Sequence, residues 1–326
     1  MTRSDMGVRP IRFGTGPGRV SDRAALLEAG RTIEKLGYAT FAMADHFMLP
    51  FAPLLALQAV ADATSTVRLT QTVLNQDFRH PAVLAKELAT LDVLSGGRLE
   101  VGIGAGWMRA EYAEAGLRFD DAPTRIDRLE EVVVILKGLF ADGPFTFSRR
   151  HFGITDLEGT PTPTQRPRPP IMIGGGGRRL LSVAGRQADI VQIMPRISGG
   201  SPSPESRPFA AETYEEKVGW VRAAAGDRFD ELELGAQLLN VTITDDPAGG
   251  FDAFFERFTR QLRSREGAVP SKEELRASPM VAVGPLDEVC AKLRDTRDRF
   301  GISYFSAPLG ATPESLAPVV ERLSGR

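Results

Sequence analysis

The sequence predicts one (β/α)8 barrel (TIM barrel) with insertions, a single domain over all 326 residues. Short apolar segments rich in β-forming residues alternate with longer segments of helical periodicity, which favours parallel strands joined by right-handed crossovers. Eight strand candidates favour a closed barrel over an open doubly wound sheet. No Pro- or Gly-rich linker divides the chain into two self-sufficient halves.

The first half of the chain alternates regularly. Its strand candidates are residues 11–16, 38–47, 66–75 and 98–106, and its helical segments are residues 22–37, 54–63, 80–97 and 124–140. Ser21 or Asp22 is the expected N-cap of the first helix, and Gly37 its end.

Two of these helices show an apolar stripe. Pro81 suits the first turn of the helix at 80–97, and Gly96 and Gly97 end it. Its predicted buried stripe is Val83, Leu84, Leu88, Leu91 and Leu94. The helix at 124–140 places Ile126, Leu129, Val132, Val133, Leu136, Leu139 and Phe140 on one face.

The second half begins with a hairpin-like insert at residues 144–154 and a Pro-rich stretch at 160–170. Strand candidates follow at residues 171–174, 189–194, 232–244 and 302–309, and clear helices at 178–188 and 285–301. Residues 196–208 have loop composition and are too long for a simple connection. We expect an insertion at about 195–210, either a mobile lid or a disordered segment.

Composition narrows the function classes. A net charge of -2 and a pI near 6.1 give no attraction to nucleic acid. No apolar run could span a bilayer and the amino terminus lacks a signal-peptide core, so we expect a soluble, cytoplasmic protein without a membrane partner. The lone Cys290 lies on a helical apolar stripe and is expected to be buried and inert. Three well-separated histidines make a metal site improbable.

The segment PPIMIGGGGRRL, residues 169–180, joins a strand, four glycines and a helix start. Backbone N–H groups at a helix amino terminus form an anion site, to which Arg178 or Arg179 can add charge. The alternative is a tight turn without a ligand. FGTGPGR, residues 13–19, is only weakly similar to a dinucleotide fingerprint, because Pro17 lies inside the turn.

Polar and glycine residues follow several strands. Because active sites of (β/α) barrels lie at the carboxyl ends of strands, we expect these residues to line one site. They are Asp45, His46, Thr72, Val73, Asn75, Trp107, Glu111, Gly174, Gly175, Gly176 and Gly177. His46 is either a structural histidine or a catalytic acid and base.

The run TQTVLNQDFRHPAVLAKELATLDVLSGGRLEVGIGAGW, preceded by ADHF and followed by APTRIDRLEEVVVILKGLF and PPIMIGGGGRRLLSVAGRQADIV, resembles the luciferase-like monooxygenase superfamily. It looks most like the branch that uses the deazaflavin coenzyme F420. The resemblance covers nearly the whole chain and is weakest at residues 195–280. It implies the bacterial luciferase-like (β/α)8 fold.

The resemblance also implies roles for the strand-end residues. His46 matches the acid and base beside the deazaflavin ring, oriented by Asp45, and Thr72–Val73 matches a non-prolyl cis peptide behind the ring. Glu111 matches an acidic position near the coenzyme, and Gly174 to Gly177 with Arg178 match the phosphate-holding loop. We also expect Asn75 and Trp107 beside the coenzyme. Trp107 stands where related sugar-phosphate dehydrogenases have an acidic residue, so their substrate is not carried over.

The implied function is hydride transfer between C5 of coenzyme F420 and an unidentified small organic substrate. An FMN-dependent monooxygenase and a non-catalytic flavin-binding barrel are the alternatives. The resemblance also implies a homodimer. We expect an aromatic pocket rim of Phe13, Phe47, Phe78, Trp107 and residues 196–208, although aromatic residues at strand ends are often core instead.

Overall fold

Eight parallel strands close into a barrel in the computed structural model, which describes residues 8–198, 201–202, 207–263, 269–308 and 310–326. The strand order is β3, β2, β1, β15, β12, β9, β8, β5, and pairing of β5 with β3 completes the circle. The barrel strands are β1 (Arg12–Thr15), β2 (Thr40–Met43), β3 (Arg68–Gln71), β5 (Leu99–Gly104), β8 (Ile171–Gly175), β9 (Ile190–Ile193), β12 (Glu233–Gln237) and β15 (Ile302–Ser306).

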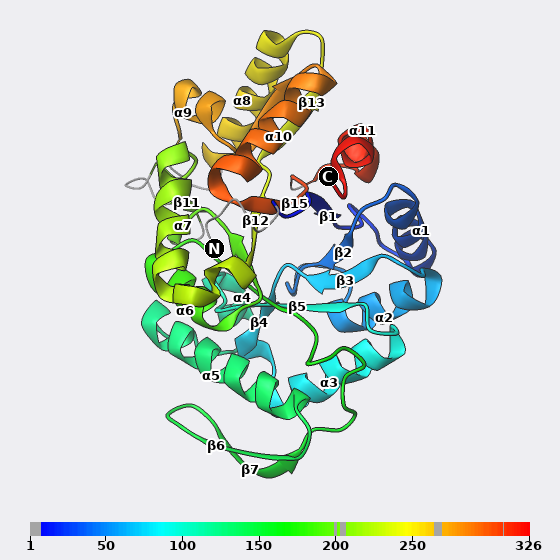
Figure 1. Ribbon diagram of the computed structural model, residues 1–326, viewed down its shortest axis with the longest axis vertical. Coiled ribbons are helices and arrows are strands. Elements are labelled where there is room, and N and C mark those ends of the chain that lie inside the picture. Colours follow the sequence, from blue (N-terminus) through cyan, green and yellow to red (C-terminus); the bar gives the residue numbers. More distant parts are fainter. Residues whose placement is uncertain (1–7, 199–200, 203–206, 264–268, 309) are drawn as a thin grey trace.

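Helices surround the strands, as the predicted alternation requires (Figure 1). Asp22 is the N-cap of the first helix and accepts a hydrogen bond from the Ala25 backbone N–H at 2.9 Å. The helices are α1 (Arg23–Lys35), α2 (Pro53–Ala63), α3 (Pro81–Leu94), α4 (Arg109–Glu114), α5 (Ala122–Phe140), α6 (Arg178–Gln187), α7 (Ala211–Ala225), α8 (Pro247–Arg263), α9 (Lys272–Ala277), α10 (Leu286–Phe300) and α11 (Pro313–Leu323). No helix in the described part of the chain is both long and apolar enough to cross a membrane.

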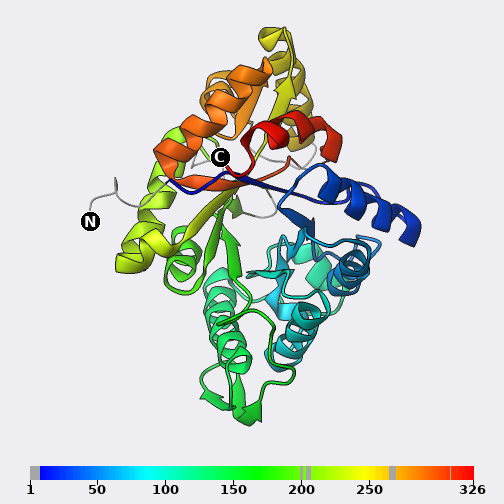
Figure 2. The ribbon, with the colours of Figure 1, turned by 45° about the vertical axis from the view of Figure 1, so that its right-hand side comes forward.

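Three insertions interrupt the alternation. The predicted hairpin is the antiparallel pair β6 (Pro144–Ser148) and β7 (Gly153–Glu158), which projects from one end of the molecule, while α8 and α9 lie at the other end (Figures 1 and 2). The third insertion, expected at 195–210, contains the short pair β10 (Ile197–Ser198) and β11 (Ser201–Pro202). The predicted lid or disordered segment includes residues 199–200 and 203–206, which lie outside the described residues.

Two predicted strands and one predicted stripe were wrong in detail. Residues 66–75 form β3 and β4 (Leu74–Asn75), and residues 232–244 form β12 and β13 (Asn240–Ile243), which pairs with β14 (Val281–Gly284) outside the barrel. On α3, Leu84, Leu88 and Leu91 are buried, but Val83 and Leu94 are exposed. Helical periodicity identifies the apolar side of a helix but not where the covered surface ends.

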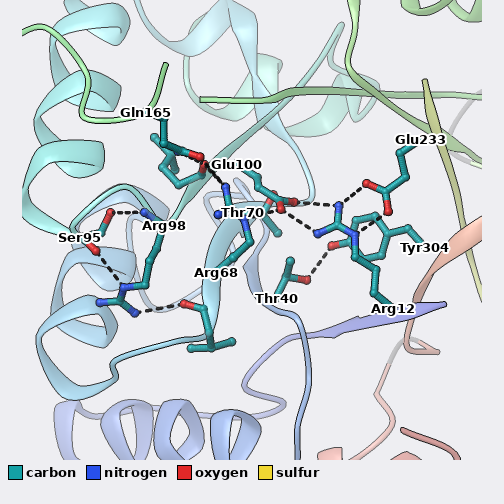
Figure 3. Close-up of polar contacts among 12 residues, drawn as sticks. Arg12, Thr40, Arg68, Thr70, Ser95, Arg98, Glu100, Gln165, Glu233 and Tyr304 are labelled. Atoms are coloured by element: carbon teal, nitrogen blue, oxygen red, sulfur yellow. Dashed lines mark hydrogen bonds and ion pairs between the residues drawn. The ribbon is translucent and has the colours of Figure 1, made fainter. Parts of the chain in front are cut away.

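The amino-terminal end of the barrel is closed by charged side chains (Figure 3). The guanidinium of Arg12 contacts Glu100 at 2.7 Å and Glu233 at 2.6 Å, and Arg68 contacts the same Glu100 at 2.6 Å. Burial opposes the charge of Arg12, but both carboxylates outweigh this effect and raise its pKa. Residues at this end of a (β/α) barrel usually contribute to stability, whereas the catalytic residues lie at the opposite end.

Alternate side chains of the strands point into the barrel. Met172, Ile190 and Tyr304 form a buried cluster separate from the main core between strands and helices. Two residues further along the strands, at the carboxyl end, the inward positions are Gly174, Gln192 and Ser306. The barrel therefore changes from an apolar middle layer to small and polar residues at the end where the candidate site lies.

Candidate active site

The predicted site residues gather at the carboxyl end of the barrel, in the segments that follow β2, β3, β5 and β8. Helix α4 brings the buried side chain of Glu111 against the segment after β2. This juxtaposition joins residues 65 positions apart in the sequence. The contacts among these segments define the site.

The centre of the site is a pair formed by His46 and Glu111. Nδ1 of His46 lies 2.8 Å from Glu111 Oε2, and the Phe47 backbone N–H donates to Glu111 Oε1 at 2.9 Å. Because a carboxylate only accepts hydrogen bonds, this contact favours the proton on Nδ1 and leaves Nε2 available to exchange a proton with a ligand. The Trp107 ring meets His46 edge-on at 5.8 Å.

The role predicted for Asp45 was wrong: Glu111, not Asp45, orients His46. Asp45 instead forms a two-pronged ion pair with Arg79, at 2.7 and 3.2 Å, and its carboxylate also accepts from the Asn75 backbone N–H at 3.0 Å. The side chain of Asp45 is only 7% exposed. A buried carboxylate of this kind binds the segment after β2 to the segment after β3, and it supports the site rather than touching the imidazole.

Asn75 lies within a second polar cluster. The Tyr112 hydroxyl lies 2.9 Å from Asn75 Oδ1 and 2.8 Å from Asp77 Oδ2. Burial raises the pKa of Tyr112, and the hydrogen bond to Asp77 adds to the effect, so the hydroxyl stays a donor. Tyr112 and Glu111 are neighbours on α4, and both are buried. The Asn75 side chain, which we predict to contact the coenzyme, is therefore already held in place by Tyr112.

An arginine fixes the segment between β5 and α4. Arg125 on α5 donates from Nε to the Ala105 carbonyl at 3.1 Å and from Nη2 to the Gly106 carbonyl at 3.3 Å. Gly106 has φ +72 and lies where an added Cβ would be 2.0 Å from the Tyr112 hydroxyl. Only glycine suits both conditions. Trp107, the next residue, is held beside His46 as a result.

The predicted cis peptide between Thr72 and Val73 is confirmed. The Val73 side chain lies over two glycines of neighbouring strands. Added Cβ atoms would lie 2.6 Å from it at Gly104 and 3.4 Å from it at Gly174. The glycines of GIGAG and the first glycine of the GGGG segment thus make room for Val73 inside the barrel.

The remaining three glycines of GGGG have different surroundings. An added Cβ would lie 2.5 Å from the Leu180 side chain at Gly175 and 2.5 Å from the Pro195 carbonyl at Gly176. At Gly177 nothing lies within 4 Å. Gly177 is the N-cap of α6 and supplies no side-chain cap for the first N–H groups of this helix. This is the part of the segment suited to an anion.

The two arginines after the glycines lie on the outer surface. Arg179 pairs with Asp127 of α5 at 2.5 Å. Arg178 is exposed and lines a shallow groove of about 550 Å³ between α5 and α6, together with Asp127, Glu130 and Arg186. The Arg178 side chain thus borders a groove between two outer helices, and its predicted contact with the coenzyme stays a prediction.

Two of the aromatic residues predicted for the pocket rim are exposed, and the rim itself stays a prediction. Phe47 is 59% and Trp107 38% exposed, and Phe47 packs on Phe78 at 4.8 Å between ring centroids. Phe13, in contrast, is fully buried and stacks on Phe305, so its assignment to the rim was wrong. Phe13 points toward the helices because its neighbour Gly14 takes the inward position.

Sequence reasoning missed Arg79, Tyr112 and Arg125. Each acts through contacts with residues 20 or more positions away, such as Arg79 with Asp45 and Arg125 with Ala105. No local motif marks such partners. Arg79 lies in the quoted segment NQDFRHP, and a charged residue in a loop between a strand and a helix was the one available signal.

Within the described residues, no three His, Cys, Asp or Glu side chains cluster as a metal site would need.

Comparison with known families agrees with the fold. The model of the luciferase-like monooxygenase family matches residues 8–303. The chain belongs to this family. A deazaflavin enzyme of similar fold is the coenzyme F420-dependent tetrahydromethanopterin reductase from Methanopyrus kandleri, at a TM-score of 0.75 and 18% identity over 96% of this chain and 98% of that one. At this identity the likeness confirms the (β/α)8 fold alone.

Characterised relatives use either of two coenzymes. The chain is 32% identical over 200 residues to an F420-dependent glucose-6-phosphate dehydrogenase of Microbacterium testaceum, a match of 55% of each chain. It is 33% identical over 131 residues to an FMNH2-dependent dimethylsulfone monooxygenase of Pseudomonas putida, covering 40% of this chain and 36% of the relative. These relatives are oxidoreductases of one family, and the chain matches only a third to about half of their length.

The residues present fit a phosphate-bearing flavin or deazaflavin. The uncapped start of α6 with open space at Gly177 suits a phosphate, and the surface of Val73 flanked by glycines suits a flat ring. His46 and Trp107 stand on the β2 and β5 side of the same barrel mouth.

Proposed function

We propose that this chain is an F420-dependent oxidoreductase that transfers a hydride between the coenzyme and a small organic substrate. The observation that carries the proposal is the pair of His46 and Glu111, at 2.8 Å, at the carboxyl end of a luciferase-like barrel. The longer of the two characterised matches, to the glucose-6-phosphate dehydrogenase, supports the deazaflavin. When bound, the coenzyme supplies two-electron chemistry at C5 of its ring.

The chain's own residues hold the ligands and move the proton. Glu111 keeps a proton on Nδ1 of His46, so that Nε2 takes a proton from an alcohol or returns one to a carbonyl as the hydride moves. The ion pair of Asp45 with Arg79 and the contacts of Arg125 keep the surrounding segments in place. The N–H groups at the start of α6 bind the phosphate.

An FMN-dependent monooxygenase is the second candidate, and the match to the dimethylsulfone monooxygenase favours it. Both candidates use the same barrel mouth and the same phosphate segment. The contact of His46 with the buried Glu111 carboxylate argues against a non-catalytic barrel, because it fixes the tautomer that leaves Nε2 available for proton exchange.

A substrate screen tests the proposal. Oxidised F420 is offered with a panel of alcohols, and reduced F420 with conjugated carbonyl compounds, while the absorbance of the coenzyme is followed. With a substrate in hand, His46→Ala should keep coenzyme affinity within about twofold while turnover falls on the order of 10²–10⁴-fold. Unchanged turnover would remove His46 from the mechanism.

We also propose a homodimer. Helices α2 and α3 expose apolar side chains that a soluble chain usually covers, with Leu55 at 77%, Val83 at 55% and Leu94 at 59% exposure. Light scattering coupled to size exclusion should give twice the chain mass, and Leu55→Glu with Leu94→Glu should reduce it. A monomeric wild-type protein would contradict the proposal.

A further inference from the structure

Gln192 on β9 is a buried polar side chain that the proposed mechanism does not use. It follows the inward-facing Ile190 by two residues, so its side chain also points into the barrel. It is 4% exposed and stands one residue before the carboxyl end of β9. Its position is therefore the top of the barrel interior, where the candidate site begins.

The carboxamide of Gln192 is held at one end and free at the other. Nε2 donates to Ser306 Oγ at 3.0 Å, while Oε1 is buried without a hydrogen-bond partner among the described residues. Gly235 on the adjacent strand makes room for it, since an added Cβ there would lie 2.3 Å from Oε1. A buried acceptor without a partner loses its hydration and gains nothing, so a bound donor would recover free energy.

Gln192 and Val73 lie on either side of the same glycine. An added Cβ at Gly174 would lie 3.4 Å from Val73 Cγ1 and 3.8 Å from Gln192 Cβ. The two side chains are thus neighbouring parts of the surface at the base of the barrel mouth. Val73 offers that surface an apolar patch, and Gln192 offers it a side-chain carboxamide.

We propose that the free end of Gln192 is an orienting contact that accepts a hydrogen bond from the pyrimidine edge of the coenzyme ring. This inference rests on the proposed function. FMN and F420 share that edge, which is an N–H between two carbonyl groups. A carboxamide is complementary to it, because its oxygen accepts from the N–H and its NH₂ group can donate to a carbonyl. The contact would orient the ring within the mouth without discriminating between the two coenzymes.

Binding titrations of oxidised FMN and oxidised F420 to the full chain test this proposal. Gln192→Leu should weaken both coenzymes about five- to tenfold, the net effect of one neutral hydrogen bond. Its melting temperature without coenzyme should equal or exceed that of the wild type, because the variant no longer buries an unpaired acceptor. Ser306→Ala, the matched control, removes the partner of Nε2 and should change either affinity less than about twofold.

A flavin methylated at the ring N–H identifies the donor. It should bind wild type about five- to tenfold more weakly than FMN, and should lose nothing further in Gln192→Leu. Equal affinities of wild type and Gln192→Leu would overturn the inference alone, as would an equal loss in Ser306→Ala, which would show a purely structural role. If wild type binds neither coenzyme, the proposed function fails and the inference with it.

Discussion

Replacing Glu111 with Gln should move the proton of His46 from Nδ1 to Nε2. In the wild type both carboxylate oxygens accept, from Nδ1 at 2.8 Å and from the Phe47 N–H at 2.9 Å. A glutamine that keeps the bond to Phe47 through its carbonyl must present its NH₂ group to Nδ1, which then has to be the acceptor. The substitution thus replaces the carboxylate oxygen that faces Nδ1 by an N–H donor. The Glu111 side chain is only 5% exposed.

The size of the effect follows from the contact that is reversed. A hydrogen bond to a charged group contributes about 1.5–3 kcal/mol, so the tautomer preference of the wild type should be roughly tenfold or more. In Glu111→Gln the preference should reverse. Because Nε2 then carries the proton and no carboxylate stabilises a protonated ring, turnover should fall on the order of 10²–10⁴-fold, with coenzyme affinity nearly unchanged.

Nitrogen-15 NMR of histidine-labelled protein measures the tautomer without a substrate. The chain has three histidines, so His80→Gln and His151→Gln assign the remaining signals to His46. We expect the Nδ1–H pattern in wild type and the Nε2–H pattern in Glu111→Gln. An identical pattern in both proteins would refute the role assigned to Glu111.

Three further predictions concern other parts of the molecule. Gly177→Ala should weaken coenzyme binding about tenfold or more in fluorescence titrations, because the added methyl group enters the open space in which the proposed phosphate lies. Gly153→Ala, where an added methyl group also meets nothing, should have no effect, and equal affinities of Gly177→Ala and wild type would favour a turn without a ligand. Glu100→Gln should lower the free energy of unfolding by about 3–5 kcal/mol in urea titrations, because it removes the buried carboxylate that pairs with Arg12 and Arg68. The control Glu28→Gln, at an exposed ion pair, should lower it by less than about 0.5 kcal/mol. A small loss in Glu100→Gln would show that Arg12 and Arg68 find other partners. The Lys217 Nζ donates to the Met194 carbonyl at 2.6 Å, and burial lowers the pKa of this amine to about 8. Above that pH the unfolded chain therefore binds more protons than the folded chain. The stability of wild type relative to Lys217→Met should therefore rise by about 1.5 kcal/mol between pH 8 and pH 9.5, and a flat difference would contradict a buried amine with a lowered pKa.

The elements of the barrel were predictable because they depend on local patterns. Apolar periodicity and capping residues such as Asp22 act within one element, and the structure has them where the sequence places them. The errors arose where a through-space contact decides. The break after Gln71 in the third strand and the departure of β13 from the barrel depend on neighbouring strands, and the sequence at either point remains rich in β-forming residues.

The site was predictable as a set of positions but not as a set of partners. Strand-end residues such as His46 and Glu111 do meet, since parallel strands bring their carboxyl ends together. Which carboxylate meets the imidazole depends on the path of α4, a short helix without a side-chain cap that periodicity does not reveal. Asp45, the sequence neighbour of His46, faces Arg79 instead.

The most direct test of the proposed function is a parallel titration of the purified chain with coenzyme F420 and with FMN, each oxidised and reduced, followed by fluorescence and absorbance. The proposal predicts micromolar or tighter binding of F420 and weaker binding of FMN. Tighter binding of FMN would assign the chain to the flavin-dependent monooxygenases of its family. Binding of neither coenzyme would contradict the proposed function.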